Sequence, residues 1–387
     1  MVMDCSKDQT RIPSADGKQP CLELPEYKAS EGSGNFTGFN SVNLQEIYIV
    51  QKQPASRAQI SPRGGHKPGI ALLPSGDLLA TQITSARCIA LCRSADNGSS
   101  WGPPREIATA AEEKIAGRAS MFSALADGTL LLGAAGAIYR SDDEGQTWHP
   151  SQVDQTVELK GRSYAIGWGE NSGPHQLADG TILCSGYISL APGHPRAYLL
   201  RSRDGGRTWG DASCIATASE VNLAVLPGDK LFACLRVATD AAGEGGAVVA
   251  LSESTDGGRT WSQARRVRGL GQAQIPGFPL YLEDGRLLIV YGNRQFPFGA
   301  QAIGSRDGGK TWDSEHPIVL AWFSWDHYCG HPRSMLLPDG SVLTGYYARV
   351  FTGAHGIVLT PTARNPDPDI VGHCLRWRVP EAWPPLQ

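Results

Sequence analysis

Two short motifs alternate along the chain, and together they limit the folds that it can adopt. The first, called the mark below, has the pattern S-x-D-x-G-x-[ST]-W and begins at residues 94, 141, 202, 254 and 305. The second is an apolar hairpin around a turn, and it begins at residues 71, 123, 175, 224, 280 and 335. A period of about fifty residues is typical of repeat architectures.

The residue types in both motifs favour short antiparallel strands. In each mark the Ser and Asp oxygens can bond to backbone groups of a tight turn, Gly supplies a positive φ, and Trp offers a large apolar surface for burial. A unit of about fifty residues with these turns holds about four strands. Six such units, none able to bury its faces alone, predict an all-β fold, a six-bladed β-propeller of four-stranded antiparallel blades.

The sixth unit has no mark, and its strands are predicted from both ends of the chain. We expect its third strand over HCLRWRV, residues 373–379, and its fourth from EIYIVQ, residues 46–51, so that an N-terminal strand closes the ring. The predicted domains are then an N-terminal arm over residues 1–43, which lacks periodicity, and the propeller over residues 44–387.

Composition excludes several classes of partner. With 35 basic and 38 acidic residues, the net charge of −3 gives no basic footprint for nucleic acid or an anionic membrane. No apolar run is long enough to cross a bilayer, and the first ten residues lack the apolar centre of a secretory signal. We therefore expect a cytoplasmic protein, or a secreted or periplasmic one if a signal peptide was removed.

No cofactor or metal is predicted. The nine cysteines form no CxxC pair and are interpreted as buried reduced thiols. No EF-hand loop, HExxH motif or phosphate-binding glycine loop occurs, because the turns account for every glycine-rich stretch. The sequence does not indicate an oligomeric state.

The marks resemble the Asp-boxes, or BNR repeats, of the sialidase superfamily, and the resemblance extends from about residue 44 to the C-terminus. It implies the six-bladed sialidase-like fold, with the marks on the outer hairpins of the blades and away from the substrate. The marks are therefore interpreted as structural, and the chemistry is expected where the first strands of the blades meet the central axis.

One sialidase motif is recognisable at such a position. In that family a Glu precedes a strand of the form E-P-x-x-x-x-L-x-D-G and polarises a tyrosine nucleophile, and an Arg ending the next strand binds the substrate carboxylate. The segment EVNLAVLPGDKLFACLR places Glu220 and Arg236 at the same separation of sixteen residues, with Val221 in place of the proline. The resemblance thus implies catalytic and carboxylate-binding roles for these two residues.

Other family positions carry different residues. The slot of the nucleophilic tyrosine holds His331, and imidazole is better suited to moving protons than to attacking an anomeric centre. The slot of the first carboxylate-binding arginine holds His66, followed by Lys67. The acid/base aspartate that follows the first hairpin in sialidases has no counterpart in LLATQITSARCIALC.

Cationic and aromatic residues still gather at the predicted axial positions. Arg118 has the same offset in the second unit as His66 in the first, and Arg294 follows a second hairpin strand as Arg236 does. The segment WDHYCGHPR adds further polar and aromatic groups before the last inner strand. The predicted catalytic residues are Glu220, His331, His66 and Asp326, and the predicted substrate-binding residues are Lys67, Arg118, Arg236, Arg294, Arg333, Tyr328 and Trp325.

Three functions fit these residues. The first is a sialidase-like glycoside hydrolase acting on a terminal acidic sugar, whose carboxylate suits bidentate guanidinium groups. The second is a polysaccharide lyase in which a histidine abstracts the proton beside a uronate carboxylate. The third is a glycan-binding propeller without catalysis. A carbohydrate is the expected partner in each case.

Overall fold

The protein is described by a computed structural model that covers residues 1–387. It describes residues 48–49, 57–59, 68–83, 88–117, 119–134, 136–167, 173–190, 195–238, 247–271, 274–294, 298–321, 324–353, 356–358, 369–381 and 383–384. The predicted N-terminal arm, residues 1–43, lies outside the described residues.

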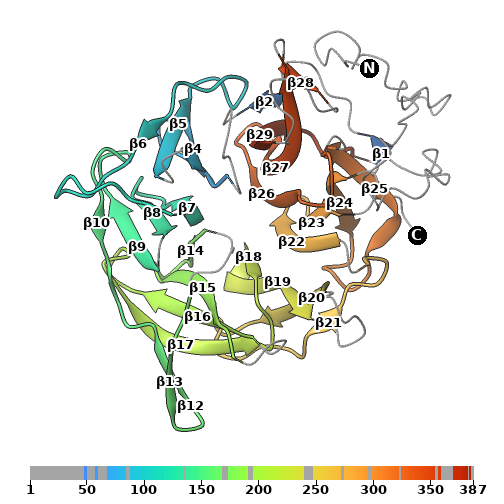
Figure 1. The fold of residues 1–387 in the computed structure, drawn as a ribbon. Coiled ribbons are helices and arrows are strands. Elements are labelled where there is room, and N and C mark those ends of the chain that lie inside the picture. Colours follow the sequence, from blue (N-terminus) through green and yellow to red (C-terminus); the bar gives the residue numbers. More distant parts are fainter. Residues whose placement is uncertain are drawn as a thin grey trace, which may run out of the picture.

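Six antiparallel sheets are arranged around a central axis, as the sequence predicts (Figure 1). Blade 1 consists of β3 (Ile70–Leu72), β4 (Leu78–Ile83), β5 (Ile89–Ser94) and β6 (Arg105–Glu106). Blade 2 consists of β7 (Ala119–Ala124), β8 (Leu130–Ala134), β9 (Ala137–Ser141) and β10 (His149–Pro150). Blade 3 consists of β14 (His175–Gln176), β15 (Ile182–Ile188), β16 (Arg196–Ser202) and β17 (Thr208–Ala216).

The other three blades repeat this order. Blade 4 consists of β18 (Val221–Leu226), β19 (Lys230–Ala238), β20 (Ala247–Ser254) and β21 (Arg265–Arg266), with the 3-10 turn η3 (Pro227–Asp229) between its first two strands. Blade 5 consists of β22 (Gln274–Tyr281), β23 (Leu287–Asn293), β24 (Gly299–Ser305) and β25 (Asp313–Ala321). Blade 6 consists of β26 (Gly330–Leu336), β27 (Val342–Gly353), β29 (Asp369–Trp377) and β2 (Arg57–Gln59).

A few strands extend this plan. The hairpin of β12 (Thr156–Leu159) and β13 (Arg162–Ala165) projects from blade 3, and β28 (Gly356–Val358) pairs with the end of β27 (Figure 1). The inner strands contact one another around the axis, with β18 against β22, β22 against β26 and β26 against β3. The starts of strands from distant parts of the chain are therefore brought together.

The ring is closed by an N-terminal strand, but the segment predicted for it was wrong. Within EIYIVQ, β1 (Tyr48–Ile49) pairs in parallel with β25 on the outer edge of blade 5. Residues 57–59 form the fourth strand of blade 6, antiparallel to β29. The run of β-branched and aromatic residues in 46–51 predicted a strand correctly, but the sheet it joins is set by tertiary contacts rather than by propensity. The third strand, β29, begins four residues before the predicted 373–379.

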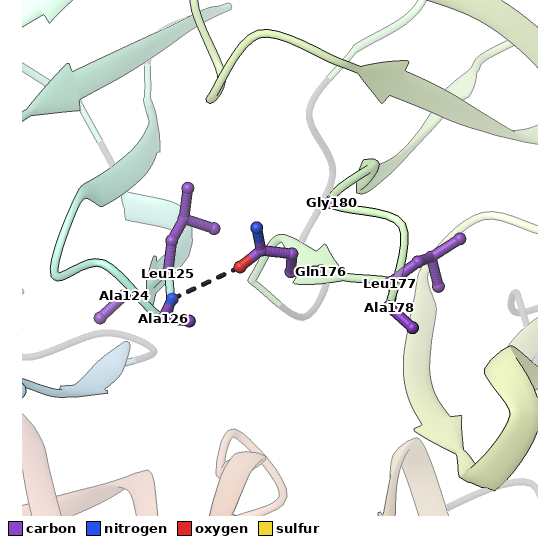
Figure 2. A pocket seen from close by; sticks show the side chains of 7 residues that line it. All are labelled: Ala124, Leu125, Ala126, Gln176, Leu177, Ala178 and Gly180. Atoms are coloured by element: carbon purple, nitrogen blue, oxygen red, sulfur yellow. Dashed lines mark hydrogen bonds between the residues drawn. The ribbon is translucent and has the colours of Figure 1, made fainter.

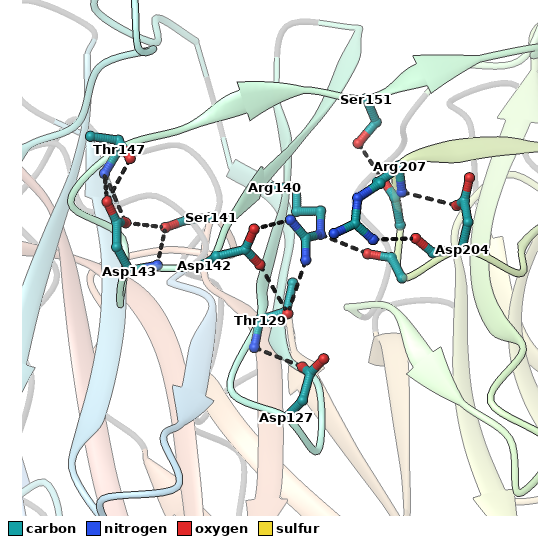
Figure 3. A network of polar contacts seen from close by, with 12 residues as sticks. Asp127, Thr129, Arg140, Ser141, Asp142, Asp143, Thr147, Ser151, Asp204 and Arg207 are labelled. Atoms are coloured by element: carbon teal, nitrogen blue, oxygen red, sulfur yellow. Dashed lines mark hydrogen bonds and ion pairs between the residues drawn. The ribbon is translucent and has the colours of Figure 1, made fainter.

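The marks are hydrogen-bonded turns between the third and fourth strands, on the outside of the ring. In the second mark, Ser141 Oγ accepts from Gly145 N at 2.9 Å. Asp143 accepts from the hydroxyl of Thr147 at 2.5 Å (Figure 3). Trp148 donates its indole N–H to the carbonyl of Gly145 at 3.1 Å. The mark thus satisfies its own backbone, which supports the structural interpretation.

Four of the seams between neighbouring blades, those from blade 1 to blade 5, are fastened through a mark. Arg140 of blade 2 donates to the carbonyl of Gly205 in the third mark at 2.9 Å, and Ser151 donates to the next carbonyl, Gly206, at 2.6 Å (Figure 3). Arg201 of blade 3 makes the corresponding bond to Gly257 in the fourth mark at 2.9 Å. Arginine side chains therefore join blades through the backbone of the marks.

Tryptophan side chains are buried in the same seams. Trp148 packs against Leu91 and Ile107 of blade 1, and Trp209 packs in the cluster that contains Leu131 of blade 2. These indole rings are at most 3% exposed. Burial of such rings contributes a large part of the hydrophobic stabilisation between blades.

The C-terminal segment takes the place of the missing sixth mark. Trp383 is fully buried in the cluster shared by blades 5 and 6 and donates its indole N–H to the carbonyl of His316 at 2.6 Å. Arg286 and Arg306 of blade 5 donate to the carbonyls of Pro380 and Pro384 at 2.8 and 2.6 Å. The seam therefore has arginine-to-carbonyl bonds like those of the other seams and a buried indole like Trp148 and Trp209.

The described cysteines carry free thiols, as the sequence predicts. The seven cysteines within the described residues are free, and six of them are buried. Burial raises the pKa of the Cys92 thiol to about 11 and that of the Cys329 thiol to about 12, so these thiols stay protonated at neutral pH. In the described part of the chain, no helix has the length and apolar character needed to cross a membrane.

Candidate active site

Glu220 and Arg236 form an ion pair at the start of blade 4. The strand pairing of β18 with β19 continues into a bond from Arg236 N to Glu220 O, and Arg236 Nη1 lies 3.0 Å from Glu220 Oε1. Glu220 is only 6% exposed, and its second oxygen, Oε2, is buried with no hydrogen-bond partner among the described residues. Because buried carboxylate oxygens are normally satisfied, Oε2 marks a position where a ligand or water is expected.

The charge of this carboxylate influences the pKa of residues from blades 3 and 6. Arg333, on β26, is buried, and burial lowers its pKa to about 10 while the charge of Glu220 opposes the shift. Arg333 is therefore still a cation at neutral pH. Burial raises the pKa of Tyr187, at the end of β15, with a further rise from Glu220 and a fall from Arg236. Blades 3, 4 and 6 thus contribute to one electrostatic environment.

His331 and Arg294 make a second pair, between blades 6 and 5. Arg294 Nη2 lies 3.1 Å from His331 Nε2, and His331 is 5% exposed. His331 has φ of 43°, in the left-handed region, where residues other than glycine are uncommon. A Cβ at the preceding Gly330 would lie 2.4 Å from Gly292 Cα, so the two backbones touch and the position of the histidine is set by the packing of blades 5 and 6.

Tyr347 connects the two pairs. Its ring stacks on His331 with 5.8 Å between centroids and an interplanar angle of 28°, and it meets Tyr328 edge-on at 5.5 Å. Burial raises the pKa of Tyr347, which Arg294 partly offsets and Glu220 raises further. Arg294 and Glu220 therefore both lie within electrostatic range of this one phenol, which stacks on His331.

The aspartate of the last loop has structural contacts. Asp326 Oδ2 pairs with Arg349 Nη1 at 2.6 Å, and its Oδ1 accepts from the backbone N–H of Tyr328 at 2.8 Å. Trp325 N donates to the carbonyl of the same arginine at 2.7 Å. These bonds shape the loop that carries Tyr328, and an acid/base role of Asp326 stays a prediction.

Three predicted site residues, His66, Lys67 and Arg118, lie outside the described residues. Two tyrosines at the site, Tyr187 and Tyr347, were not predicted. No sequence signal distinguished them, since an aromatic residue within a buried strand has the same pattern as a core residue. Tyr187 is the residue before the last one of β15, and Tyr347 is paired with Gly330, the first residue of β26.

Within the described residues, no group of three or more His, Cys, Asp or Glu side chains is placed to hold a metal ion. A pocket of about 490 Å³ lies elsewhere, between the turns that join the first two strands of blades 2 and 3 (Figure 2). Its one polar side chain, Gln176, accepts from Ala126 N at 3.4 Å. Its lining has no titratable group, so it has no evident catalytic chemistry.

The ring of six blades defines the chain as a six-bladed β-propeller. The family described as a BNR repeat-like domain matches residues 93–295, which is more than half of the chain. The chain belongs to this family. A search of curated proteins finds no significant match.

Solved structures share the fold at low sequence identity. A protein of unknown function from Dyadobacter fermentans DSM 18053 is 20% identical, with a TM-score of 0.64 over 84% of this chain and 98% of that one. The Hadza microbial sialidase Hz136 is 20% identical, with a TM-score of 0.55 over 81% of this chain and 65% of that one. An alpha-L-arabinanase of Penicillium chrysogenum, complexed with arabinobiose, is 14% identical, with a TM-score of 0.55 over 85% and 97%.

Proposed function

We propose that the axial site is that of a glycoside hydrolase acting on a terminal acidic sugar. The observation that carries the proposal is Glu220, a buried carboxylate with one oxygen held by Arg236 and the other without a partner among the described residues. A buried carboxylate of this kind is suited to general acid–base chemistry, which accelerates such reactions by about 10²–10⁴-fold.

The charge around Glu220 supports an acidic substrate. Arg236, Arg294 and Arg333 bring three guanidinium groups to a site whose only carboxylate outside the Asp326–Arg349 pair, among the described residues, is Glu220. The chain as a whole has a net charge of −3, so this excess of positive charge is local. A guanidinium has five N–H donors, and the ion pair with Glu220 engages only Nη1 of Arg236. The remaining donors suit a sugar carboxylate.

In the proposed reaction each residue has a separate task. The guanidinium groups bind the carboxylate and orient the sugar ring. Glu220 then accepts through Oε2 a proton from the attacking water, since Oε1 is held by Arg236. The water oxygen bonds to the anomeric carbon as the bond to the leaving oxygen breaks, and the proton passes on to that leaving oxygen. Holding the reacting groups in one geometry lowers the entropic part of the barrier. Glycoside hydrolases among the structures that share the fold support this reaction class by analogy of fold alone.

A lyase acting at a uronate is the second candidate, and the pair of His331 and Arg294 favours it. A neutral imidazole beside a guanidinium is the arrangement that proton abstraction next to a bound carboxylate requires.

One assay separates the candidates. The protein is incubated with sialosides, uronate-terminated oligosaccharides and neutral arabinosides, and both reducing ends and the absorbance of unsaturated uronates are recorded. Release of an acidic sugar without new absorbance supports the hydrolase, and an unsaturated product supports the lyase. Cleavage of the neutral arabinosides alone would contradict an acidic substrate, and binding of a glycan without product would contradict both enzymes.

A further inference from the structure

We propose that Arg294 occupies the lone pair of His331 Nε2, so that this histidine cannot accept a proton there. A bound carboxylate makes the lone pair available by taking Arg294 as its own partner. The inference rests on the acidic ligand of the proposed function but not on hydrolysis. It concerns the contact of 3.1 Å between Arg294 Nη2 and His331 Nε2.

The chemistry of the two side chains fixes the direction of this hydrogen bond. A guanidinium can only donate, so His331 Nε2 must be the acceptor and the imidazole proton must lie on Nδ1. The ring is therefore neutral, and the lone pair that could accept a proton is occupied by Arg294. In this state His331 cannot act as a base through Nε2.

A carboxylate is a better partner for Arg294 than the imidazole is. A carboxylate carries the opposite charge to the guanidinium and presents two oxygens to its planar fork, so it can accept two parallel bonds, whereas the imidazole accepts one. Arg294 Nε is buried and has no hydrogen-bond partner among the described residues. A carboxylate that binds through Nε and Nη2 would satisfy this donor and draw Nη2 away from His331.

The histidine is held in place while the arginine changes partner. His331 is 5% exposed, stacks on Tyr347 and follows Gly330, whose backbone contacts Gly292. Arg294 follows the end of β23 and is more exposed than His331. Ligand binding therefore leaves Nε2 of His331 in place with its lone pair available, and a proton from a bound water or sugar hydroxyl can then move to it, giving an imidazolium and leaving the oxygen electron pair for bond formation.

Long-range ¹H–¹⁵N NMR of the full-length protein, labelled at histidine, tests the inference without any turnover. His331→Gln identifies the His331 signals by their loss. In the free protein we expect the pattern of an Nδ1-protonated ring with Nε2 accepting a hydrogen bond. Sodium acetate or glucuronic acid, but not sodium chloride at equal ionic strength or the neutral methyl glucoside, should shift the Nε2 resonance downfield as that bond is lost.

A variant supplies the same comparison without ligand. Arg294→Gln should shift the Nε2 resonance downfield in the free protein, whereas Arg203→Gln, at an exposed arginine on the outer rim, should leave it unchanged. An Nε2-protonated ring in the free protein would overturn the inference, as would an unchanged Nε2 resonance in Arg294→Gln or at saturating acetate. The shift with no cleavage of any glycan would leave the inference standing and contradict only the hydrolase.

Discussion

Glu220 and Arg236 are sixteen residues apart in the chain and 3.0 Å apart at the axis, where the first two strands of blade 4 bring the carboxylate and the guanidinium together. This pair satisfies one carboxylate oxygen and leaves Oε2 buried without a partner among the described residues. The site is therefore partly assembled before a ligand binds, which is the condition for efficient positioning of a substrate.

We expect Glu220→Gln to lower kcat/KM by about 10²–10⁴-fold on any glycan that the assay identifies as a substrate, because the amide cannot exchange a proton at the glycosidic bond. Steady-state kinetics measure the effect, and thermal unfolding checks that the variant is folded. Glu158→Gln, at an exposed position of the β12–β13 hairpin, is the matched control and should retain full activity. Wild-type turnover in Glu220→Gln would remove this residue from the proposed mechanism.

Trp383→Ala should lower the free energy of unfolding by about 3–5 kcal/mol, because a fully buried indole is replaced by a cavity between blades 5 and 6. Urea denaturation measures the change. Glu381→Ala serves as the control, since the structure uses only the backbone carbonyl of this exposed residue, in a bond from Arg306. Equal stability of the two variants would show that the C-terminal segment does not stand in for a mark.

The glycines of the marks should tolerate substitution poorly for two reasons that a pair of variants separates. Gly206 has φ of 83°, and a Cβ there would lie 2.6 Å from Leu131 Cδ2 of the neighbouring blade. Gly180, in a hairpin turn outside the marks, has a similar φ of 85°, and a Cβ added there would have no atom within 4 Å. Gly180→Ala should therefore lose about 1–2 kcal/mol from backbone strain alone, and Gly206→Ala should lose about 1–3 kcal/mol more from overpacking. Equal losses in urea denaturation would contradict the steric part of this explanation.

Acid should weaken the marks over a defined range of pH. Hydrogen bonds from the hydroxyl and the backbone N–H of Ser100 lower the pKa of Asp96 to about 2, below the value of about 3.9 in an unfolded chain. A lowered folded-state pKa stabilises the protein above the unfolded value, and this stabilisation is lost as the pH falls from about 4 to about 2. Asp96→Asn should be less stable than the wild type at neutral pH, and the difference should shrink across that range.

Unfolding by denaturant at a series of pH values tests this expectation. Asp154→Asn, at an exposed aspartate outside the marks, should show no comparable pH-dependent difference. A constant difference between Asp96→Asn and wild type from neutral pH to pH of about 2 would be inconsistent with a stabilising carboxylate at Asp96.

The fold was predictable because its signals are local. Each hairpin and each mark carries its own turn residues, so five blades could be placed from short segments alone. The closing strand was not predictable in the same way, because Arg57–Gln59 has no apolar alternation and its place in blade 6 depends on a sheet formed by residues more than 300 positions away. The role of Trp383 was missed for the same reason, since a single tryptophan outside the marks has no repeat pattern.

The places of the candidate site residues in the fold could be predicted in part, and their roles stay predictions. Glu220, Arg236, Arg294, His331 and Arg333 come together because strand starts and strand ends converge at the axis of a propeller. Tyr187 and Tyr347 were missed, because an aromatic residue within a buried strand has the same sequence pattern as a core residue. The ion pair of Asp326 with Arg349 could not be predicted either, because Arg349 lies on β27 and no spacing rule links the two residues.

The closure of the ring has a mechanical consequence. A circle of six blades has six joints, and five of them link repeats that follow each other in the chain. The remaining joint, between blades 6 and 1, depends on the three-residue strand β2 from the N-terminal part of the chain, which pairs with β29 from the C-terminal part. We therefore expect a pulling force on the two termini to separate β2 from β29 before any other blade comes apart.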